Sequence, residues 1–413
     1  MPDSMQNSDI SPRILLIPDV PIEKGFGHYS YADVLQFHLR QLGAEVAIVS
    51  DTAKHSQFHF NGAERIPYDA TEAEFKARLL AFQPDVVVFD TFPFWMFDQK
   101  KYKTYIDAAY RQSSFKPALA TVIRDIWAWR EHVVHQIEED LPDFAAVVIR
   151  GDEKNSRYED PRLTSFISQS GVELLRCGYI VDPWLFSNEC HELSSTKSQT
   201  VIIHQGGSLP SPTTPLERVE QLHSFFIASI KSKECLRKRS SALANMTWRV
   251  LLHPDYDSEM RAEIVAIAAE SERVNIENMP DKPAYLRAMV QSQLVLSRSG
   301  YNTTLELMAT RTPRVIMPFA QQDAEQLTRL RMLAETGKGF ITIPGELGVR
   351  ESGMTAMEHV GILSNHIASA METAFDGREL LSADSERDFV GGMYAARIFL
   401  SLAERCRSSY RRS

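Results

Sequence analysis

The sequence predicts an α/β protein built from two doubly wound domains in tandem. Short apolar runs recur along the chain and alternate with helical patterns, and strands that are apolar throughout indicate parallel sheets covered by helices on both faces. The alternation pauses once, in a polar stretch from about 181 to 199, and then restarts. The length of 413 residues is sufficient for two or three domains of about 150 residues each.

The first half of the chain has a regular succession of predicted elements. Its first apolar run leads through a turn that contains glycine into a helical pattern that continues to about Leu42, where Gly43 fits the helix stop. Further apolar runs follow, with helical stretches between them. The predicted strands of this half are 13–18, 45–50, 85–90, 118–123 and 145–149.

The second half repeats the pattern and ends in a longer helix. Helices are expected at 303–309 and 324–336, and an amphipathic helix from about 385 to 406 precedes a basic tip. The predicted strands are 200–205, 247–253, 274–276, 294–297, 314–318 and 339–343. We therefore expect a first domain at 1–180, a linker at 181–199, a second domain at 200–384, and a terminal helix with its tail at 385–413.

Composition excludes several classes of protein. The 44% of apolar and 24% of charged residues are ordinary globular values, which disfavour a disordered, collagenous or coiled-coil chain. A net charge of −9 disfavours general binding to nucleic acid, although a local basic patch stays possible. The four cysteines form no C-x-x-C pair, and we find neither a signal peptide nor an apolar run near the about 20 residues that span a bilayer. We expect a soluble cytoplasmic protein with free thiols.

The segment around the predicted strand 294–297 carries the strongest functional signal. In doubly wound sheets, ligands bind beyond the carboxyl ends of the strands. Here Arg298, Ser299 and Gly300 form a turn before a helix, whose unpaired N–H groups and dipole make a cradle for a diphosphate. Asn302 and Glu306 share one helix face, and Glu306 can accept two hydrogen bonds from a ribose diol. The alternative is a plain turn followed by a surface carboxylate.

Two further turns contain glycine. Gly206, Gly207 and Ser208 directly follow a predicted strand, and paired glycines let the backbone approach a ligand closely, although ordinary turns also have this composition. The turn from Gly25 to Gly27 resembles a shortened dinucleotide fingerprint that lacks its third glycine. An acidic residue, Asp51, ends the next strand, so these residues leave NAD binding open.

Polar residues also gather at strand ends in the first half. His28 starts a helix after the first strand, and histidine suits general base catalysis near neutral pH. Asp90 ends another strand and can orient a histidine ring, as in a catalytic triad. The alternatives are a structural histidine and an aspartate that caps a turn. Arg124 and Asp125 lie on the same predicted rim.

No signal for a bound metal or cofactor stands out. The histidine pairs His55/His59 and His132/His135 have helical spacing, but no carboxylate or cysteine set completes a ligand shell. No D-x-D stands directly at the end of a predicted strand, and neither a P-loop nor a kinase motif set is present. We therefore expect no metal ion and no cofactor.

Taken in order along the chain, these loops resemble those of GT-B glycosyltransferases, with two Rossmann-like domains that face each other across a cleft. The stretch from 294 to 337 is similar to the nucleotide-sugar half of the bacterial lipid-intermediate N-acetylglucosaminyltransferase (MurG-like) family, of which the chain resembles a divergent member. The sequence GYNTTLE also resembles the G-[WY]-N-S-x-x-E core of transferases that glycosylate small molecules. The residues that match are Gly25, Gly27, His28, Gly206, Gly207, Ser208, Arg298, Ser299, Gly300, Asn302, Thr304, Glu306, Pro318, Phe319, Asp323 and Gln326.

The resemblance implies an enzyme that moves a sugar from a nucleoside diphosphate sugar, expected to be a UDP-sugar, to a hydroxyl group. The donor is a substrate, and the acceptor would be a small molecule, a lipid-linked molecule or a glycan held by the first domain. Glu306 would hold the ribose and His28 would be the general base with Asp90 as its partner. The displacement would be inverting and independent of metal, and the last helix would cross back to the first domain. The resemblance places Gly207, Ser299 and Gly300 at the diphosphate and Asp323 and Gln326 at the sugar.

Other functions stay open on the sequence alone. A nucleotide-sugar hydrolase or a 2-epimerase can use the same scaffold, and product analysis with and without acceptor separates them from a transferase. A catalytically silent GT-B partner subunit would not need His28, Asp90 and Glu306 together. A DNA-base glycosyltransferase is disfavoured by the acidic net charge, although the basic tail is compatible with it.

Overall fold

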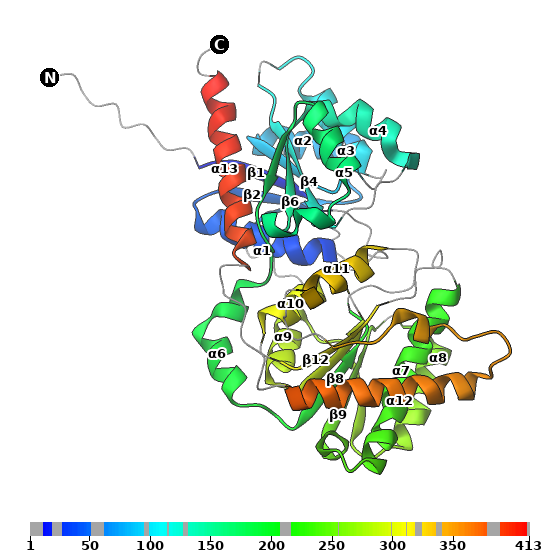
Figure 1. Cartoon of the computed structure of the whole chain (residues 1–413). Coiled ribbons are helices and arrows are strands. Elements are labelled where there is room, and N and C mark those ends of the chain that lie inside the picture. The colour runs from blue at the N-terminus through cyan, green and yellow to red at the C-terminus, as the bar shows by residue number, and fades with distance from the viewer. Residues whose placement is uncertain are drawn as a thin grey trace.

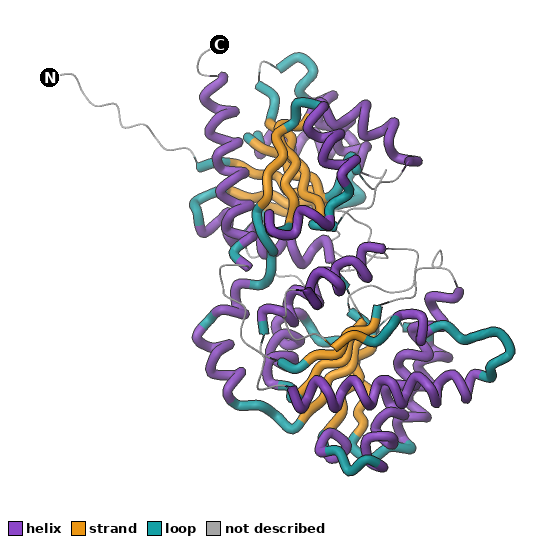
Figure 2. Tube along the Cα trace, viewed as in Figure 1, coloured by secondary structure: helices purple, strands orange, loops and turns teal. Residues whose placement is uncertain are grey.

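The computed structural model shows two α/β units, each a sheet flanked by helices (Figure 1). Strands run through the middle of both units, with helices on either side of them (Figure 2). The predicted fold class, two doubly wound α/β domains, is confirmed by the two parallel sheets. The residues that the structure describes are 11–18, 27–50, 62–94, 99–113, 115–126, 131–206, 216–254, 256–298, 300–310, 312–318, 324–335, 341–377 and 389–410.

The first sheet has seven parallel strands in the order β3-β2-β1-β4-β5-β6-β7. The apolar runs predict five of them, and the structure adds β3 and β7, which the sequence analysis missed. Both are four residues long and lie at the edges of the sheet, so neither is buried on both faces and neither has a continuous apolar run. The strands are β1 (Arg13–Ile17), β2 (Glu45–Ser50), β3 (Glu64–Pro67), β4 (Val86–Asp90), β5 (Ala118–Arg124), β6 (Phe144–Arg150) and β7 (Glu173–Arg176).

Alternate residues of these strands enter two separate cores. Ile14 and Leu16 of β1 pack with helix α1 and the last helix, α13, while Leu15 and Ile17 pack on the other face with α2 to α5. Helix α1 stops before Gly43, whose φ of +88° fits the predicted helix stop. The helices are α1 (Gly27–Gln41), α2 (Glu72–Phe82), α3 (Lys100–Ala109), α4 (Val134–Asp140) and α5 (Pro161–Gln169).

The second sheet has six parallel strands in the order β10-β9-β8-β11-β12-β13. All six overlap predicted strands. They are β8 (Thr200–His204), β9 (Thr247–Leu252), β10 (Val274–Asn278), β11 (Leu294–Arg298), β12 (Arg314–Met317) and β13 (Ile341–Thr342). The helices around them are α7 (Leu216–Lys238), α8 (Ser258–Ala269), α9 (Lys282–Gln291), α10 (Tyr301–Ala309), α11 (Ala324–Glu335) and α12 (Ala356–Asp376). Helices α7 and α12 supply much of the apolar core on one face of this sheet.

The polar stretch that predicts a linker is helical for much of its length. It contains the short helix η6 (Pro183–Phe186) and α6 (Asn188–Ser195). Its polar residues act as helix caps, because Asp182 accepts a hydrogen bond from the backbone of Trp184 and Ser187 accepts one from that of Cys190. The composition that predicts a loop is therefore, in part, the composition of helix starts.

The last helix, α13 (Gly391–Tyr410), packs against the first domain, as the resemblance implies (Figure 1). Val390, just before it, pairs with Ile180 in an isolated bridge. Phe399 is fully buried in the core that α1 shares with the first sheet. Near the end of the helix, Arg407 forms an ion pair of 2.7 Å with Asp85, which precedes β4. Residues from the two ends of the chain therefore build one core.

Replacing Arg407 tests this anchor. Asp85 is buried and accepts hydrogen bonds from Arg407 and from the backbone N–H of Arg13. We expect Arg407→Met to lower the free energy of unfolding in urea by about 1–2 kcal/mol, because a hydrogen-bonded charge loses its partner at a partly exposed site. Arg405→Met is the control, since its ion pair with Glu173 is exposed on both sides and should contribute less than about 1 kcal/mol. Equal losses in the two variants would contradict a specific anchor at Asp85.

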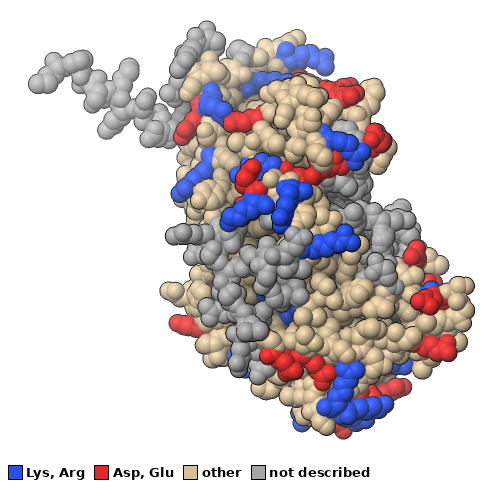
Figure 3. Space-filling view, in the orientation of Figure 1, with Lys and Arg blue, Asp and Glu red and all other residues tan. Residues whose placement is uncertain are grey.

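The surface shows no dominance of one charge on the face drawn in Figure 3. Lys and Arg side chains lie among Asp and Glu side chains over both units. Among the described residues, no helix combines the length and the apolar character needed to cross a bilayer.

Candidate active site

The N-terminal ends of helices α1 and α10 meet at the interface between the two domains. Asn302 donates a hydrogen bond of 2.8 Å from Nδ2 to the backbone oxygen of Gly27. A Cβ atom on Gly27 would lie 3.6 Å from that nitrogen, so the two helices approach closely. Helix α1 follows β1 and α10 follows β11, and both strands lie in the middle of their sheets. The sequence predicts Asn302 as a donor-binding residue; the structure shows its amide bound to the other domain.

His28 and Asp90 lie in contact, which is the pairing that the sequence predicts. His28 is the second residue of α1, and its Nδ1 contacts Oδ2 of Asp90 at the end of the neighbouring strand β4. Burial alone would raise the pKa of Asp90, but the charges of His28 and Arg150 outweigh it and lower that pKa. The next residue, Thr91, has a φ of +72°, a strained conformation for a β-branched side chain. The buried carboxylate of Asp90 therefore stays ionised beside the ring of His28.

Arg150 is a third member of this cluster, and the sequence analysis did not single it out. It ends β6, is 1% exposed, and places Nη2 3.7 Å from Oδ1 of Asp90. Its guanidinium lies 4.3 Å from the ring centroid of Tyr31 and 5.0 Å from that of Tyr301. Burial lowers the pKa of Arg150, but Asp90 and the two tyrosines raise it by more than burial lowers it. The pKa is therefore raised overall, and the residue stays charged. The one feature of the sequence that could have identified Arg150 as a site residue is its position at the carboxyl end of a buried strand.

Arg124 and Asp125 lie on the predicted rim, but Asp125 joins the two domains. Its carboxylate forms an ion pair of 2.9 Å with Arg329 of α11, and both side chains are buried. Arg124 lies 5.8 Å from the ring centroid of Tyr301. The hydroxyl of Tyr301 in turn donates to the backbone oxygen of Arg150 over 2.7 Å. These contacts hold the start of α10 against the carboxyl edge of the first sheet.

The Gly206 turn lies against the first turn of α10, the helix that starts at the Gly300 turn. A Cβ atom on Gly206 or on Gly300 would lie 3.6 or 3.8 Å from Oγ1 of Thr303. Gly206 has a φ of +87°, which glycine adopts without strain. Both turns therefore bring backbone to one small region beside the positive end of the α10 dipole.

His204 fixes the geometry of the Gly206 turn. It is the last residue of β8, fully buried, and burial lowers its pKa to about 3, so the ring is neutral. Nδ1 accepts a hydrogen bond of 3.1 Å from the backbone N–H of Gly206. Nε2 therefore carries the proton and donates to the hydroxyl of Tyr285, 3.0 Å away. His204 begins the segment 204–208 that the sequence marks as a candidate phosphate loop, whereas no motif in the sequence marks Tyr285.

Glu306 lies about one turn further along α10 and is nearly buried. Its side chain is 3.8 Å from Nζ of Lys282, the first residue of α9. Burial raises the pKa of Glu306 to about 7, although the charge of Lys282 opposes this rise. The carboxylate is thus neither a surface group nor a residue of the apolar core, and it is oriented by a buried cation.

The remaining predicted residues have mixed positions. Thr304 is buried. Arg298 is buried too, with its guanidinium 5.5 Å from the ring centroid of Phe225 on α7. Gln326 lies partly exposed in the first turn of α11. The predictions for Gly25, Gly207, Ser208, Ser299 and Asp323 fall outside the described residues.

No metal centre is found in the part of the chain that the structure describes. Groups of three or more His, Cys, Asp or Glu residues that could hold an ion are absent from it. Beside His28, the carboxylate of Asp90 lies near the buried guanidinium of Arg150.

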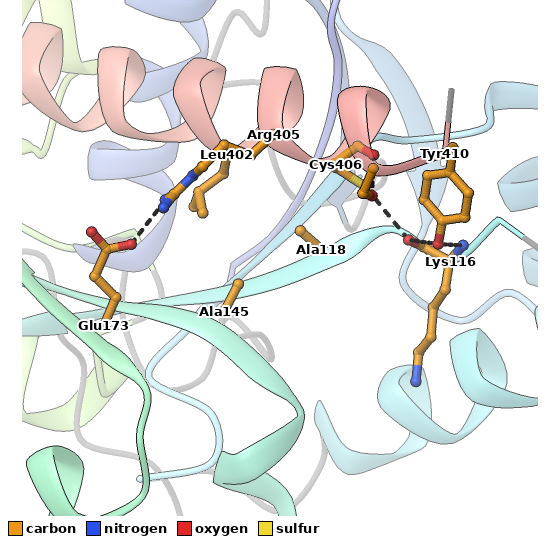
Figure 4. Close-up of a pocket in the computed structure, with 9 residues that line it drawn as sticks. Lys116, Ala118, Ala145, Glu173, Leu402, Arg405, Cys406 and Tyr410 are labelled. Atoms are coloured by element: carbon orange, nitrogen blue, oxygen red, sulfur yellow. Dashed lines mark hydrogen bonds and ion pairs between the residues drawn. The ribbon is translucent and has the colours of Figure 1, made fainter. Parts of the chain in front are cut away.

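A surface groove of about 380 Å³ lies elsewhere, between α13 and the first sheet (Figure 4). Ala118, Ala145 and Glu173, which lie at the starts of β5, β6 and β7, line it together with Arg405 and Cys406. Asp90 and Arg150 lie at the opposite, carboxyl ends of their strands. Since ligands of doubly wound sheets bind at the carboxyl ends, the groove is not part of the candidate active site.

The chain was compared with protein-family models, curated proteins and solved structures. No family model and no curated protein matches it. Arabidopsis thaliana UGT89C1 in complex with UDP superposes with a TM-score of 0.58 at 13% identity, over 96% of this chain and 100% of that one. A UDP-glucosyltransferase from Polygonum tinctorium, described as capable of glucosylating indoxyl, gives 0.53 at 11% identity, over 96% and 100%.

An epimerase is also among the similar structures. A putative UDP-N-acetylglucosamine 2-epimerase from Listeria monocytogenes superposes with a TM-score of 0.56 at 11% identity, over 98% of each chain. At such low identity these matches bear on the fold, and they extend over nearly the whole chain in each case. Together with the two parallel sheets and the returning C-terminal helix, they show that the chain has the GT-B fold.

Proposed function

We propose that this protein is a glycosyltransferase that moves a sugar from a nucleoside diphosphate sugar, expected to be a UDP-sugar, to a hydroxyl group of an acceptor. One observation carries the proposal. The His28–Asp90 pair of the first domain lies beside the point where α1 meets α10, whose first turn is approached by the Gly206 and Gly300 turns. A base on one domain thus faces a cradle for phosphate on the other.

The proposed reaction assigns a task to each side of the interface. Nδ1 of His28 faces Asp90, so Nε2 takes the proton from the acceptor hydroxyl. The acceptor oxygen attacks the anomeric carbon while the bond from that carbon to the diphosphate oxygen breaks. The electron pair leaves with the nucleoside diphosphate, and the anomeric configuration inverts. Asp90 stabilises the imidazolium that forms.

The second domain stabilises the leaving group in this proposal. Backbone N–H groups of the glycine turns and the positive end of the α10 dipole face the departing diphosphate. Glu306 accepts hydrogen bonds from the ribose hydroxyls. The fold similarity to a UDP complex and to a UDP-glucosyltransferase supports this choice of donor.

A second candidate is a hydrolase or an epimerase that acts on nucleotide sugars. The similarity in fold to a putative 2-epimerase structure supports this second candidate. The three reactions differ in their products, because a transferase joins the sugar to the acceptor, a hydrolase releases free sugar, and a 2-epimerase returns the nucleotide sugar with C2 inverted. Product analysis in the presence and absence of acceptor therefore separates them.

Nucleotide binding tests the donor assignment directly. A ligand at about 100 times its dissociation constant should stabilise the fold by about 2.7 kcal/mol. We expect UDP, or another nucleoside diphosphate in a panel, to raise the melting temperature, with uridine alone as the control that lacks the diphosphate. A panel in which no nucleoside diphosphate or nucleotide sugar gives a shift would contradict the proposed donor site.

Turnover should not depend on a divalent metal. In the proposed mechanism, backbone dipoles and the α10 N-terminus stabilise the leaving diphosphate, a task that a metal ion performs in other enzymes. We expect the rate to stay unchanged in EDTA and on later addition of magnesium or manganese. Activity that EDTA abolishes and either metal restores would show that the leaving group is stabilised differently.

A further inference from the structure

Lys282 connects three parts of the molecule that the proposed reaction uses separately. Its Nζ lies 3.8 Å from Glu306, 3.4 Å from Asp182 in the segment between the sheets, and 2.7 Å from Oγ of Ser30 on α1. Ser30 is two residues beyond His28 on that helix. The lysine side chain is only 11% exposed, so these contacts are made largely out of water.

Local structure explains why the lysine points here. Lys282 is the first residue of α9, and the side chain of Asp281 caps the helix by accepting a hydrogen bond from the backbone N–H of Ala284. Pro283 at the next position fits the first turn of a helix. The start of α9 is thereby fixed beside α1, and the lysine chain reaches both Ser30 and Glu306.

The groups around Glu306 set the balance between its charged and neutral forms. Burial raises the pKa of Glu306 to about 7, the positive charge of Lys282 on α9 lowers it, and the negative charge of Asp182, just before η6, raises it. Tyr285 on α9 is coupled to Glu306 as well, because burial and then the charge of Glu306 raise the pKa of this tyrosine. A carboxylate that accepts two hydrogen bonds from a diol does so best when ionised, since charge-assisted bonds are the stronger kind.

We propose that Lys282 is a positioning residue for the donor: it favours the ionised form of Glu306 and orients that carboxylate toward the ribose diol, and it ties this carboxylate to helix α1, which carries His28. The inference rests on the donor assignment proposed above. It deepens that assignment, because it makes donor affinity depend on a lysine that contacts the other domain.

The test compares UDP affinity between pH 5.5 and 8.5 in four proteins. In the wild type, affinity should rise with pH through about 7 as Glu306 ionises, and level off about one pH unit higher. Lys282→Met removes the charge, so the rise should move to higher pH, with affinity lowered about tenfold at pH 7 and partly recovered at pH 8.5. Lys282→Arg keeps the charge and should resemble the wild type. Ser30→Ala removes the tie to α1 but keeps the charge beside Glu306, so its pH dependence should stay that of the wild type.

A second measurement uses the protein without nucleotide. A carboxyl whose pKa is raised by folding stabilises the fold most when protonated, and this contribution is lost as pH rises through the folded pKa. The wild type should therefore lose melting temperature between about pH 4.5 and 7 relative to Glu306→Gln. In Lys282→Met the loss should extend to higher pH.

The outcomes separate the two proposals. If UDP binds and Lys282→Met keeps the wild-type pH dependence in both measurements, the role of Lys282 is overturned while the donor site stands. If Ser30→Ala and Lys282→Met change affinity equally at every pH, the lysine is only a structural tie and the inference also fails. If the wild type binds no nucleotide, the proposed function fails, and with it the role of Lys282 toward a donor, whatever the second measurement shows of its pairing with Glu306.

Discussion

His28→Ala should lower kcat by about 10²–10⁴-fold, the usual contribution of a positioned general base. The residue is nearly buried at the start of α1 and contacts the carboxylate of Asp90, so alanine removes the proton acceptor without exposing a large core. The dissociation constant of UDP, measured by calorimetry, should stay near that of the wild type, because the donor contacts are assigned to the other domain. His135→Ala, on the exposed side of α4, is a control that should keep full activity.

Two further variants examine whether the residues act as a unit. Asp90→Asn should lower kcat by no more than His28→Ala, because asparagine keeps the contact but loses the charge that stabilises the imidazolium. The double variant should be little worse than His28→Ala alone, since groups that act as a unit are not additive. If His28→Ala instead weakens UDP binding and leaves the acidic limb of the pH–rate profile in place, His28 contacts the donor and is not the base.

Glu306→Ala should weaken UDP binding by about 1.5–3 kcal/mol, which is roughly a 10- to 150-fold rise in the dissociation constant. The loss comes from hydrogen bonds between a charged acceptor and the ribose hydroxyls. The variant also removes one of the two carboxylates that pair with the buried Lys282, and leaves Asp182 as the other. Folding should therefore be checked by melting temperature before affinity is compared. Calorimetric titration with UDP at pH 8, where the wild-type carboxylate is ionised, gives the cleanest comparison.

Glu270→Ala is the matched control, because this glutamate is exposed at the end of α8. Its affinity for UDP should equal that of the wild type. An unchanged affinity in a folded Glu306→Ala protein would remove Glu306 from the donor site and leave its buried pairing with Lys282 as a structural feature.

The fold was largely predictable because its central strands are buried on both faces. Runs such as 85–90 and 294–297 show no alternation of polar and apolar residues, and their alternation with helical patterns along the chain favours a parallel sheet covered on both faces. The edge strands β3 and β7 were not predicted, because a strand at the edge of a sheet is not buried on both faces and does not require a continuous apolar run. The composition of the segment around α6 predicts a linker, because the residues that cap helices are also common in loops.

The candidate site was predictable where function follows from a position beside a turn. Asp90 ends β4, Gly206 lies two residues after β8, and His28 lies in the first turn of the helix that follows β1; the shared edge of a parallel sheet brings such residues together. The sequence could not reveal the contacts between the domains. The contacts of Arg150 with Tyr301, of Asp125 with Arg329 and of Lys282 with Ser30 depend on how the domains pack, and no local pattern in the sequence encodes them.

The most direct test of the proposed transfer is product analysis with a panel of nucleotide sugars and hydroxyl acceptors. Proton NMR follows both the release of nucleoside diphosphate and the anomeric configuration of the sugar. The account predicts release that depends on acceptor, a new glycosidic bond of inverted configuration, and loss of both in His28→Ala. Free sugar formed equally well without acceptor, or recovery of the nucleotide sugar with C2 inverted, would contradict it.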